Sequence, residues 1–261
     1  MLHRSNFSTP PCIELASPVD LPIYHVGPSQ EAGPLPSVFY FSLSGPDSLE
    51  REPYCQPVIF LAEKKFRIFS FTLPAHGPGY DDKDAMSFWA NDVSIGLNRI
   101  AEFVEQSLVN IDYLIAQGWV DAQRVAVAGL SRGGFIAAHI AAQSASIQTV
   151  LAYAPLVSLE ILDEFHALQE HPLVHKLALK RIIPQLIHKS LRFYIGNRDT
   201  RVSTDTCYHF IRDLTEEAYR QGVRSPQVSL VVSPSVGHRG HGTLLPIFED
   251  GINWLCKQLE K

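Results

Sequence analysis

Short apolar segments alternate along this chain with longer segments in which apolar residues recur every three or four positions. The short segments are rich in β-branched and aromatic residues, which is typical of buried strands, and the longer spacing is typical of amphipathic helices. The pattern predicts strands at residues 37–43, 66–73, 125–128, 148–153, 191–195 and 227–232, and helices at 54–65, 84–117, 135–142, 203–221 and 243–259. This alternation forms βαβ units, so we expect an α/β protein with a mostly parallel central sheet and helices on both faces.

The chain has the length of one large domain, and no shift in composition divides it, so we expect a single domain over residues 1–261. Residues 1–37 are rich in Pro and Ser, with β-like pieces at 12–16 and 21–26 that suit an antiparallel hairpin at a sheet edge. Residues 156–190 form a mostly helical excursion, which predicts a small cap or insertion. Its apolar side chains would either line an acyl pocket beneath a lid or pack on the core as ordinary helices.

One stretch combines a strand, a tight turn and a helix start with a serine at its apex. Residues 125–128 are apolar, residues 135–142 are rich in Ala, and between them Gly129 and Gly133 flank Ser131. Because glycine has no Cβ, the strand and the helix can approach closely while the serine takes a strained conformation that projects Oγ outward. The stretch therefore predicts a nucleophile elbow, and the alternative is a Gly-rich turn that links a strand to a helix.

Composition and charge narrow the classes of function. Hydrophobic residues make up 46% of the chain and charged residues 19%, an ordinary globular balance. The formal net charge of -5 does not indicate the positively charged surface that nucleic-acid binding needs, so we expect no nucleic acid as a partner. The first residues lack the apolar core of a signal peptide, and no apolar run reaches the length of a membrane span. We therefore expect a soluble, cytoplasmic protein, with its oligomeric state left open.

Cysteine and histidine spacing predicts neither a metal site nor a cofactor. The four cysteines are far apart and form no C-x-x-C pair: Cys12, Cys55, Cys207 and Cys256. His171 and His175 have the spacing of two ligands on one helix face, but Pro172 interrupts that face and no third ligand is apparent. We expect free thiols in a reducing compartment, no metal and no cofactor.

Three motifs carry a resemblance to a known fold family. They are Gly129-Leu130-Ser131-Arg132-Gly133-Gly134, Gly196-Asn197-Arg198-Asp199-Thr200-Arg201-Val202 and Gly237-His238. With the order of elements, they make the chain resemble the α/β-hydrolase fold over nearly all of residues 20–260. Within that fold it looks most like the dienelactone-hydrolase and prolyl-oligopeptidase-like branch of small esterases and peptidases. The resemblance implies an α/β-hydrolase fold with a short helical cap insertion.

The resemblance also implies a catalytic triad in the chain order nucleophile, acid, histidine, which Ser131, Asp199 and His238 supply. His238 would take the serine proton as the hydroxyl attacks a carbonyl, and Asp199 would orient the imidazole. Both follow predicted strands, at the edge where open α/β sheets place their sites. The competing residues are His241 for the base and Asp163, Asp205 and Asp213 for the acid.

The oxyanion hole is where the chain departs from the family pattern. One donor is expected to be the backbone N–H of Arg132, the residue after the nucleophile. The second normally follows the strand at 37–43, but there the chain has Ser44-Gly45-Pro46, and proline has no N–H to donate. We therefore expect the donor to be Ser44 or Leu43. A His-Gly pair at His76 follows the next strand, where a structural turn is the simpler interpretation.

The sequence thus predicts a serine hydrolase that cleaves a carboxylic ester of a small or medium substrate through an acyl-enzyme on Ser131. The alternatives are an acyltransferase, thioesterase or small peptidase with the same triad, and a binding module that has lost catalysis. The candidate substrate-binding residues are His76, Arg198 and Leu156. Arg132 and Arg198 could also meet an acidic group of the substrate, although structural ion pairing is the commoner role of such residues.

Overall fold

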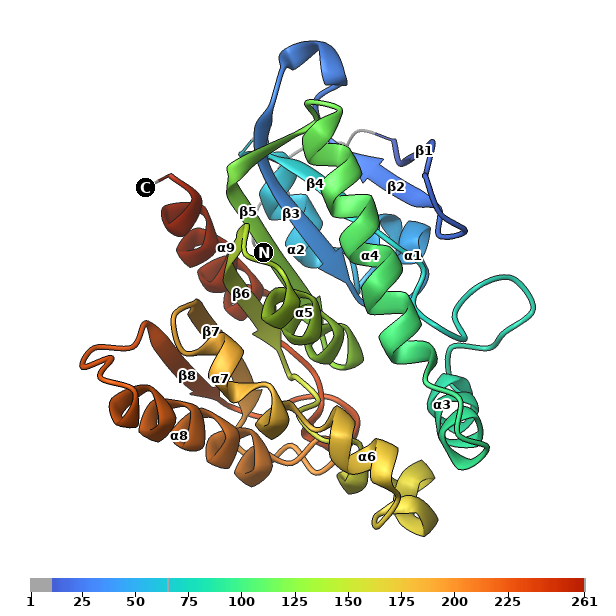
Figure 1. Cartoon of the computed structure of the whole chain (residues 1–261), viewed down its shortest axis with the longest axis vertical. Coiled ribbons are helices and arrows are strands. Elements are labelled where there is room, and N and C mark those ends of the chain that lie inside the picture. The colour runs from blue at the N-terminus through green and yellow to red at the C-terminus, as the bar shows by residue number, and fades with distance from the viewer. Residues whose placement is uncertain (1–10, 65, 261) are drawn as a thin grey trace.

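An eight-stranded sheet runs through the computed structural model, which describes residues 11–64 and 66–260 (Figure 1). The strand order is β1-β2-β4-β3-β5-β6-β7-β8, and pairing is parallel from β4 to β8 and antiparallel from β1 to β4 through β2. The strands are β1 (Ile13–Leu15), β2 (Ile23–Val26), β3 (Leu35–Phe41), β4 (Arg67–Ser70), β5 (Val120–Leu130), β6 (Ile147–Tyr153), β7 (Ser190–Gly196) and β8 (Val228–Ser233). The predicted parallel sheet and the antiparallel edge hairpin are both present.

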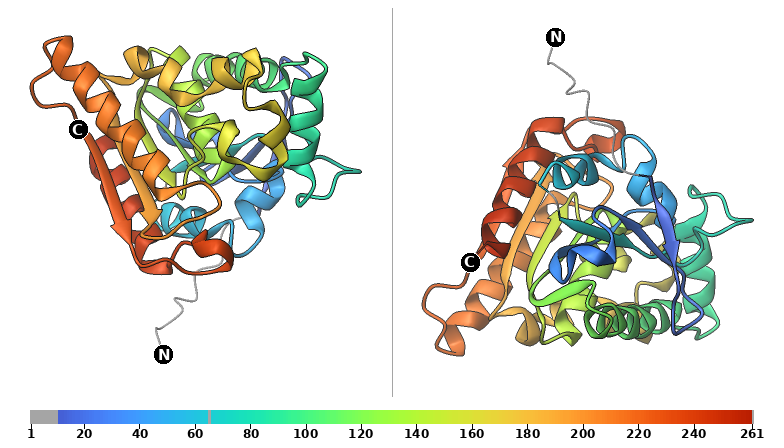
Figure 2. Two further views of the ribbon diagram at one scale, coloured as in Figure 1. Left: turned by 90° about the horizontal axis from the view of Figure 1, so that it is seen from below. Right: turned by 90° about the horizontal axis from the view of Figure 1, so that it is seen from above.

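Helices cover both faces of the sheet, as the two turned views in Figure 2 show. The α-helices are α1 (Gly45–Glu50), α2 (Gln56–Ala62), α3 (Ala85–Ser94), α4 (Arg99–Ala116), α5 (Arg132–Gln143), α6 (Pro172–Leu177), α7 (Ile183–Leu186), α8 (Thr204–Arg220) and α9 (Leu245–Leu259). Short 3-10 turns are η1 (Gln30–Ala32), η2 (Leu159–Ile161), η3 (Asp163–Leu168), η4 (Leu179–Arg181) and η5 (His238–Gly240). Among the described residues, no helix has the length and apolarity needed to cross a membrane.

Alternation along the central strands divides the core into two layers. In β3, Phe39 and Phe41 point into the layer that α3, α4, α5 and α8 cover, while Val38 and Tyr40 point into the layer under α2 and α9. Successive side chains of a strand face opposite sides, so a strand buried on both faces has to be apolar at every position. This requirement explains the continuous apolar runs from which the strands were predicted.

Several predicted elements differ from the structure in their bounds, and two differ in kind. The single helix expected at 84–117 is two helices, because the chain turns at Gly96 with a φ of 79° and Asn98 then caps α4 by accepting the Ala101 N–H. The excursion over 156–190 contains short 3-10 and α turns rather than long helices. Many of its apolar side chains are buried in the same layer as α5. The first ten residues of the expected domain lie outside the described residues.

Among the described glycines, the one with the least room for a Cβ lies where α5 leaves β5. A Cβ on Gly133 would lie 1.9 Å from the carbonyl oxygen of Phe41, at the end of β3, and a Cβ on Gly129 would lie 2.2 Å from the carbonyl carbon of Gly133. Real side chains do not occupy such positions. The two glycines are therefore required by the backbone packing between β3, β5 and the start of α5.

We expect Gly133→Ala to lower the free energy of unfolding by roughly 1–3 kcal/mol, because the new methyl group forces β3 and α5 apart. Gly77→Ala is the matched control, since its Cβ would meet only the Thr72 side chain at 3.8 Å. That control should stay within about 0.5 kcal/mol of the wild type. Urea unfolding of the three proteins measures the difference, and equal stability of the two variants would contradict the packing interpretation.

Candidate active site

The carboxyl ends of three parallel strands bring a serine, an aspartate and a histidine together. Ser131 follows β5, Asp199 follows β7, and His241 follows β8. In the structure His241 Nε2 lies 2.8 Å from Ser131 Oγ, and His241 Nδ1 lies 2.7 Å from Asp199 Oδ2. A carboxylate only accepts, so Nδ1 donates to Asp199 and Nε2 is left to accept the serine hydroxyl proton. This is the connectivity of a Ser-His-Asp catalytic triad.

The elbow serine is held in a conformation that few residues adopt. Ser131 has φ 55° and ψ −118°, outside the helical and extended regions. Its N–H donates to the Tyr153 carbonyl at 2.8 Å, and its carbonyl accepts the Leu156 N–H at 3.1 Å. Both partners lie at or just beyond the end of β6, so the neighbouring strand fixes the strained turn from two sides.

The acid is fixed by its own turn. Asp199 is buried, and while Oδ2 contacts His241, Oδ1 accepts the N–H groups of Arg201 and Val202 at 2.9 and 3.0 Å. The Thr204 hydroxyl accepts the Asp199 N–H at 2.9 Å and donates to the Gly196 carbonyl. With both carboxylate oxygens engaged, the side chain has little freedom to leave the imidazole.

The base predicted from the Gly-His motif is wrong, because the structure places His241 rather than His238 at the serine. The loop after β8 turns back on itself: Gly242 donates to the Val236 carbonyl at 2.8 Å, and Arg239 takes a φ of 57°. This turn exposes His238 on its outer side and returns His241 toward the sheet edge. His241 is the competitor that the sequence had left open.

Two ion pairs join the excursion to the loops that carry the acid and the base. Glu164 in η3 receives Arg201 through two hydrogen bonds of 2.9 and 2.7 Å, and the adjacent Asp163 receives Arg239 at 2.6 Å. Burial is the largest single influence and would raise the pKa of the Glu164 carboxyl, but the hydrogen bonds from Arg201, a backbone hydrogen bond and the Arg201 charge together outweigh it and lower that pKa. Arg201 is two residues from Asp199, and Arg239 is two residues from His241, so η3 holds both loops. We call these two ion pairs the clamp. The sequence had considered Asp163 only as an acid.

Arg132 and His76 form a second polar contact beside the nucleophile. Arg132 Nη1 donates to His76 Nε2 at 2.8 Å and to the Asp82 carbonyl at 3.1 Å, and His76 Nδ1 donates to the Pro74 carbonyl at 2.8 Å. These contacts are those of a neutral imidazole. Burial, with the Arg132 charge beside it, lowers the pKa of His76 to about 4.

The expected oxyanion donors meet different surroundings. The Arg132 N–H lies in the first turn of α5, where no carbonyl of the helix can accept it. The Leu43 N–H, by contrast, donates to Ser48 Oγ at 2.9 Å, so the structure gives that candidate another acceptor. Ser44 caps α1 by accepting the Asp47 N–H. The Ser44 N–H as the second oxyanion donor stays a prediction.

The three candidate substrate-binding residues differ in their surroundings. His76 is buried and lines a cavity, but Leu156 is buried beneath the elbow, where its N–H supports Ser131. Arg198 is exposed, and its backbone N–H donates to Ser235 Oγ at 2.7 Å. Leu156 and Arg198 therefore have local structural contacts, and His76 is the one that faces an open space.

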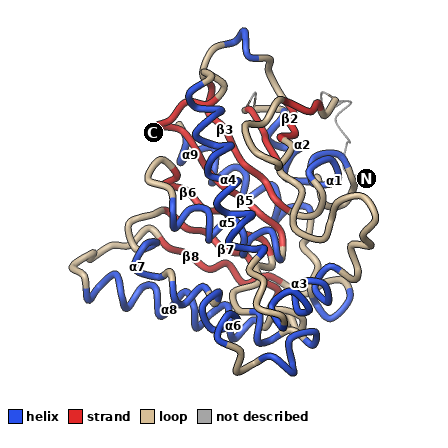
Figure 3. The backbone as a smooth tube through the Cα atoms, turned by 45° about the vertical axis from the view of Figure 1, so that its right-hand side comes forward, coloured by secondary structure: helices blue, strands red, loops and turns tan. Residues whose placement is uncertain are grey.

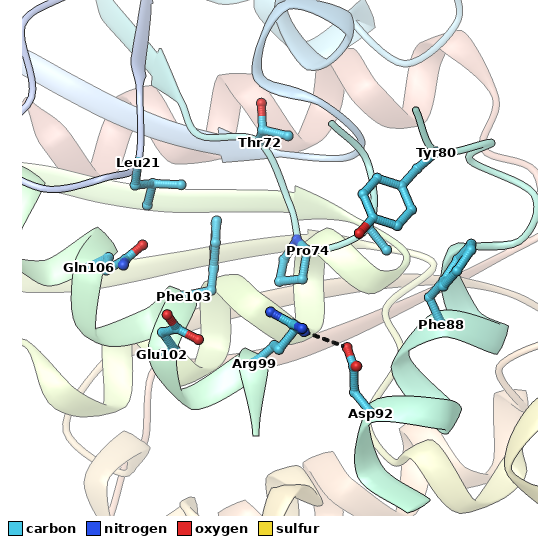
Figure 4. A pocket seen from close by; sticks show the side chains of 11 residues that line it. Leu21, Thr72, Pro74, Tyr80, Phe88, Asp92, Arg99, Glu102, Phe103 and Gln106 are labelled. Carbon is cyan, nitrogen blue, oxygen red and sulfur yellow. Dashed lines mark ion pairs between the residues drawn. The ribbon is translucent and has the colours of Figure 1, made fainter. Parts of the chain in front are cut away.

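Two cavities border the loop that follows β4. The larger, of about 660 Å³, is lined by residues that include Ser44, His76 and Asp82. The smaller, of about 230 Å³, lies between α3, α4 and this loop, and Figure 4 shows Tyr80 and Phe88 at one side of it. The Asp92–Arg99 ion pair, at 2.9 Å, crosses its other side. Both hydrogen-bond partners of the Arg132 side chain among the described residues, His76 and Asp82, line the larger cavity.

The comparison with family models covers the part of the chain that contains the whole triad. Residues 98–261 match the model of the prolyl oligopeptidase family. The chain belongs to the prolyl oligopeptidase family. A rice protein named acylamino-acid-releasing enzyme 2 (Oryza sativa subsp. japonica) is 30% identical over 100 residues, which is 38% of this chain and 12% of the rice protein.

Solved structures show the same fold, an α/β-hydrolase, as the resemblance implied. A candidate dienelactone hydrolase from Klebsiella pneumoniae has a TM-score of 0.67 at 18% identity, with 96% of this chain and 98% of that chain covered. The Pyrococcus horikoshii acylaminoacyl peptidase has a TM-score of 0.64 at 16% identity, covering 98% of this chain and 42% of that one. The chain thus spans less than half of the peptidases it matches and nearly all of the smaller hydrolase.

The choice of base can be tested with the two histidines of one loop. We expect His241→Gln to slow the reaction of Ser131 with a fluorophosphonate by roughly 10²- to 10⁴-fold, because among the described residues His241 is the base hydrogen-bonded to Ser131 Oγ. His238→Gln is the matched control and should react at close to the wild-type rate. Labelling rates from intact-protein mass spectrometry give the answer, and a reversed order would return the base to His238.

The clamp makes a separate prediction. Glu164→Gln removes a two-bond partner whose side chain is 22% exposed, and we expect fluorophosphonate labelling to slow roughly 3- to 30-fold as the Asp199 loop loosens. Asp163→Asn is the adjacent control and should have a smaller effect, since the Asp163 side chain is 73% exposed. Equal effects of the two variants would show that η3 does not hold the acid loop through Arg201.

Proposed function

We propose that this protein is a serine hydrolase that forms an acyl-enzyme on Ser131. The observation that carries the proposal is the unbroken chain of short hydrogen bonds from Ser131 through His241 to Asp199. Membership of the prolyl oligopeptidase family supports the same chemistry. Backbone hydrogen bonds from the end of β6 hold Ser131, and those of its own turn hold Asp199, so the geometry is prepared before any substrate arrives.

The reaction follows from the positions of the three groups. Ser131 Oγ forms a bond to the carbonyl carbon of the substrate while its proton passes to His241 Nε2. The imidazolium is stabilised by the buried Asp199 carboxylate and then gives its proton to the departing alcohol or amine. Water attacks the acyl-enzyme with His241 again as the base, which frees the acid and restores Ser131. We propose that the Arg132 N–H, free of a helix acceptor in the first turn of α5, stabilises the negative charge on the carbonyl oxygen.

We propose carboxylic esters of small or medium size as the substrates, with short peptides as the second candidate. The similarity to a hydrolase that this chain covers almost completely favours the first. The family match and the similarity to acylaminoacyl peptidases favour the second. We further propose that residues 156–190 act as a small cap, because η3 contacts α3. Helices α3 and α6 lie at the same end of the sheet (Figure 3).

A substrate panel with a nucleophile control tests the proposal. We expect the wild type to release nitrophenol from nitrophenyl esters with a burst of acyl-enzyme, and Ser131→Ala to lose at least about 10³-fold of kcat. Acyl-peptide nitroanilides, measured in parallel, distinguish an esterase from a peptidase. A folded Ser131→Ala variant that keeps wild-type turnover would refute the role of Ser131, and a folded wild type that a fluorophosphonate does not label would favour a binding module.

A further inference from the structure

The charge of Arg132 has no carboxylate partner although acidic side chains lie nearby. Two neighbouring arginines have carboxylate partners of their own: Arg51 with Asp82 at 2.6 Å, and Arg201 with Glu164 at 2.7 Å. Among the described residues, no carboxylate oxygen lies within 4.0 Å of the Arg132 guanidinium. The site therefore contains two arginine–carboxylate ion pairs, and Arg132 is a third cation without a carboxylate in contact.

The partners that Arg132 does have are neutral. His76 accepts through Nε2, with a pKa of about 4 that keeps the imidazole uncharged near pH 7, and the other partner is the backbone carbonyl of Asp82. Burial and then the nearby Arg201 charge lower the pKa of Arg132, and the more distant Asp82 and Glu164 carboxylates offset this only in part. Charges taken out of water are normally paired, so an exception beside a nucleophile points to a ligand.

Arg67 shows what a purely structural arginine looks like in this chain. It is fully buried, also lacks a carboxylate partner among the described residues, and donates to four backbone carbonyls, those of Pro28, Ser29, Gly33 and Trp119. Its guanidinium also lies 5.0 Å from the centre of the Trp119 ring. Arg132 is only partly buried, and its hydrogen bonds to other described residues come from Nη1 alone. A guanidinium has five N–H donors, so Arg132 keeps donors for a ligand.

The position of Arg132 suits a group attached to the substrate carbonyl. Its side chain extends from the elbow toward the loop after β4, where His76 and Asp82 line the cavity of about 660 Å³. His241 approaches Ser131 from the opposite side, from the loop after β8. A substrate that lies on Ser131 thus has the base on one side and the uncompensated cation on the other.

We propose that Arg132 is a specificity residue that binds a carboxylate of the substrate on the cavity side of Ser131. This inference rests on the proposed serine hydrolase function and names its substrate class, esters or amides that carry a second, ionised carboxyl group. Asp47 and Asp81 also line the cavity and would repel an anion that entered further. The bound carboxylate therefore sits at the Arg132 end, with the guanidinium as its hydrogen-bond donor.

Three nitrophenyl esters of matched chain length test the assignment: the monoesters of adipic acid (anionic), caproic acid (neutral) and aminocaproic acid (cationic). We expect the wild type to have the highest kcat/KM for the adipate. The adipate-to-caproate ratio of kcat/KM should fall roughly ten- to a hundredfold in Arg132→Gln and less in Arg132→Lys, which keeps the charge. Arg212→Gln is the matched control, because Arg212 lies on α8, is paired with Asp213 at 2.8 Å and does not line this cavity, and it should keep the wild-type ratio.

A wild-type preference for the aminocaproate would overturn the proposal, as would an unchanged ratio in Arg132→Gln or an equal fall in Arg212→Gln. Binding of adipate monoamide to Ser131→Ala and to Ser131→Ala with Arg132→Gln, measured by calorimetry, gives a readout that needs no turnover. Weaker binding in the second protein supports the assignment even if no ester is cleaved, and equal binding refutes it. Failure of fluorophosphonate labelling would instead count against the proposed function, so the two failures remain distinguishable.

Discussion

The structure depends on the direct contact between the backbone at the end of β3 and the start of α5. A Cβ on Gly133 would lie 1.9 Å from the Phe41 carbonyl oxygen, so any side chain there would separate strand and helix. The contact lets Ser131 stand at the tip of a turn with a φ of 55° while its N–H and carbonyl bond to the segment at the end of β6. Strain at one residue is thus supported by three neighbouring elements, which keeps Oγ in a fixed position before a substrate binds.

Around that fixed serine, the remaining groups are held by contacts between distant parts of the chain. His241 lies 110 residues from Ser131, and only the parallel register of β5, β7 and β8 brings their loops to one edge. The ion pairs from η3 then link both loops to the excursion between β6 and β7. The bidentate and mostly buried Arg201–Glu164 pair carries more of this constraint than the exposed Asp163 pair, because solvent screens the latter.

Much of the fold and the nucleophile could be predicted from the sequence, because both leave local signals. Strands buried on both faces are apolar at every position, and the elbow needs glycines at set spacings. The base left no such signal: Gly237-His238 and Gly240-His241 are the same dipeptide three residues apart. Only the turn with Arg239 at a φ of 57° selects the second. The two ion pairs of the clamp join residues that are 37 and 76 positions apart in the sequence, so no local sequence pattern could predict them.

Among the described residues, two arginines that are buried or partly buried have no carboxylate partner. A comparison of the two distinguishes a charge with a structural role from a charge that is available to a ligand. Arg67 is enclosed by backbone carbonyls and an aromatic ring, so its loss would leave several acceptors without a donor. Arg132 has one carbonyl and one neutral imidazole, an arrangement that orients the guanidinium without neutralising it. A fold selected for stability alone would have paired this charge or replaced it. An unpaired Arg132 beside the elbow lowers stability, and this is expected of a site in which a ligand supplies the opposite charge.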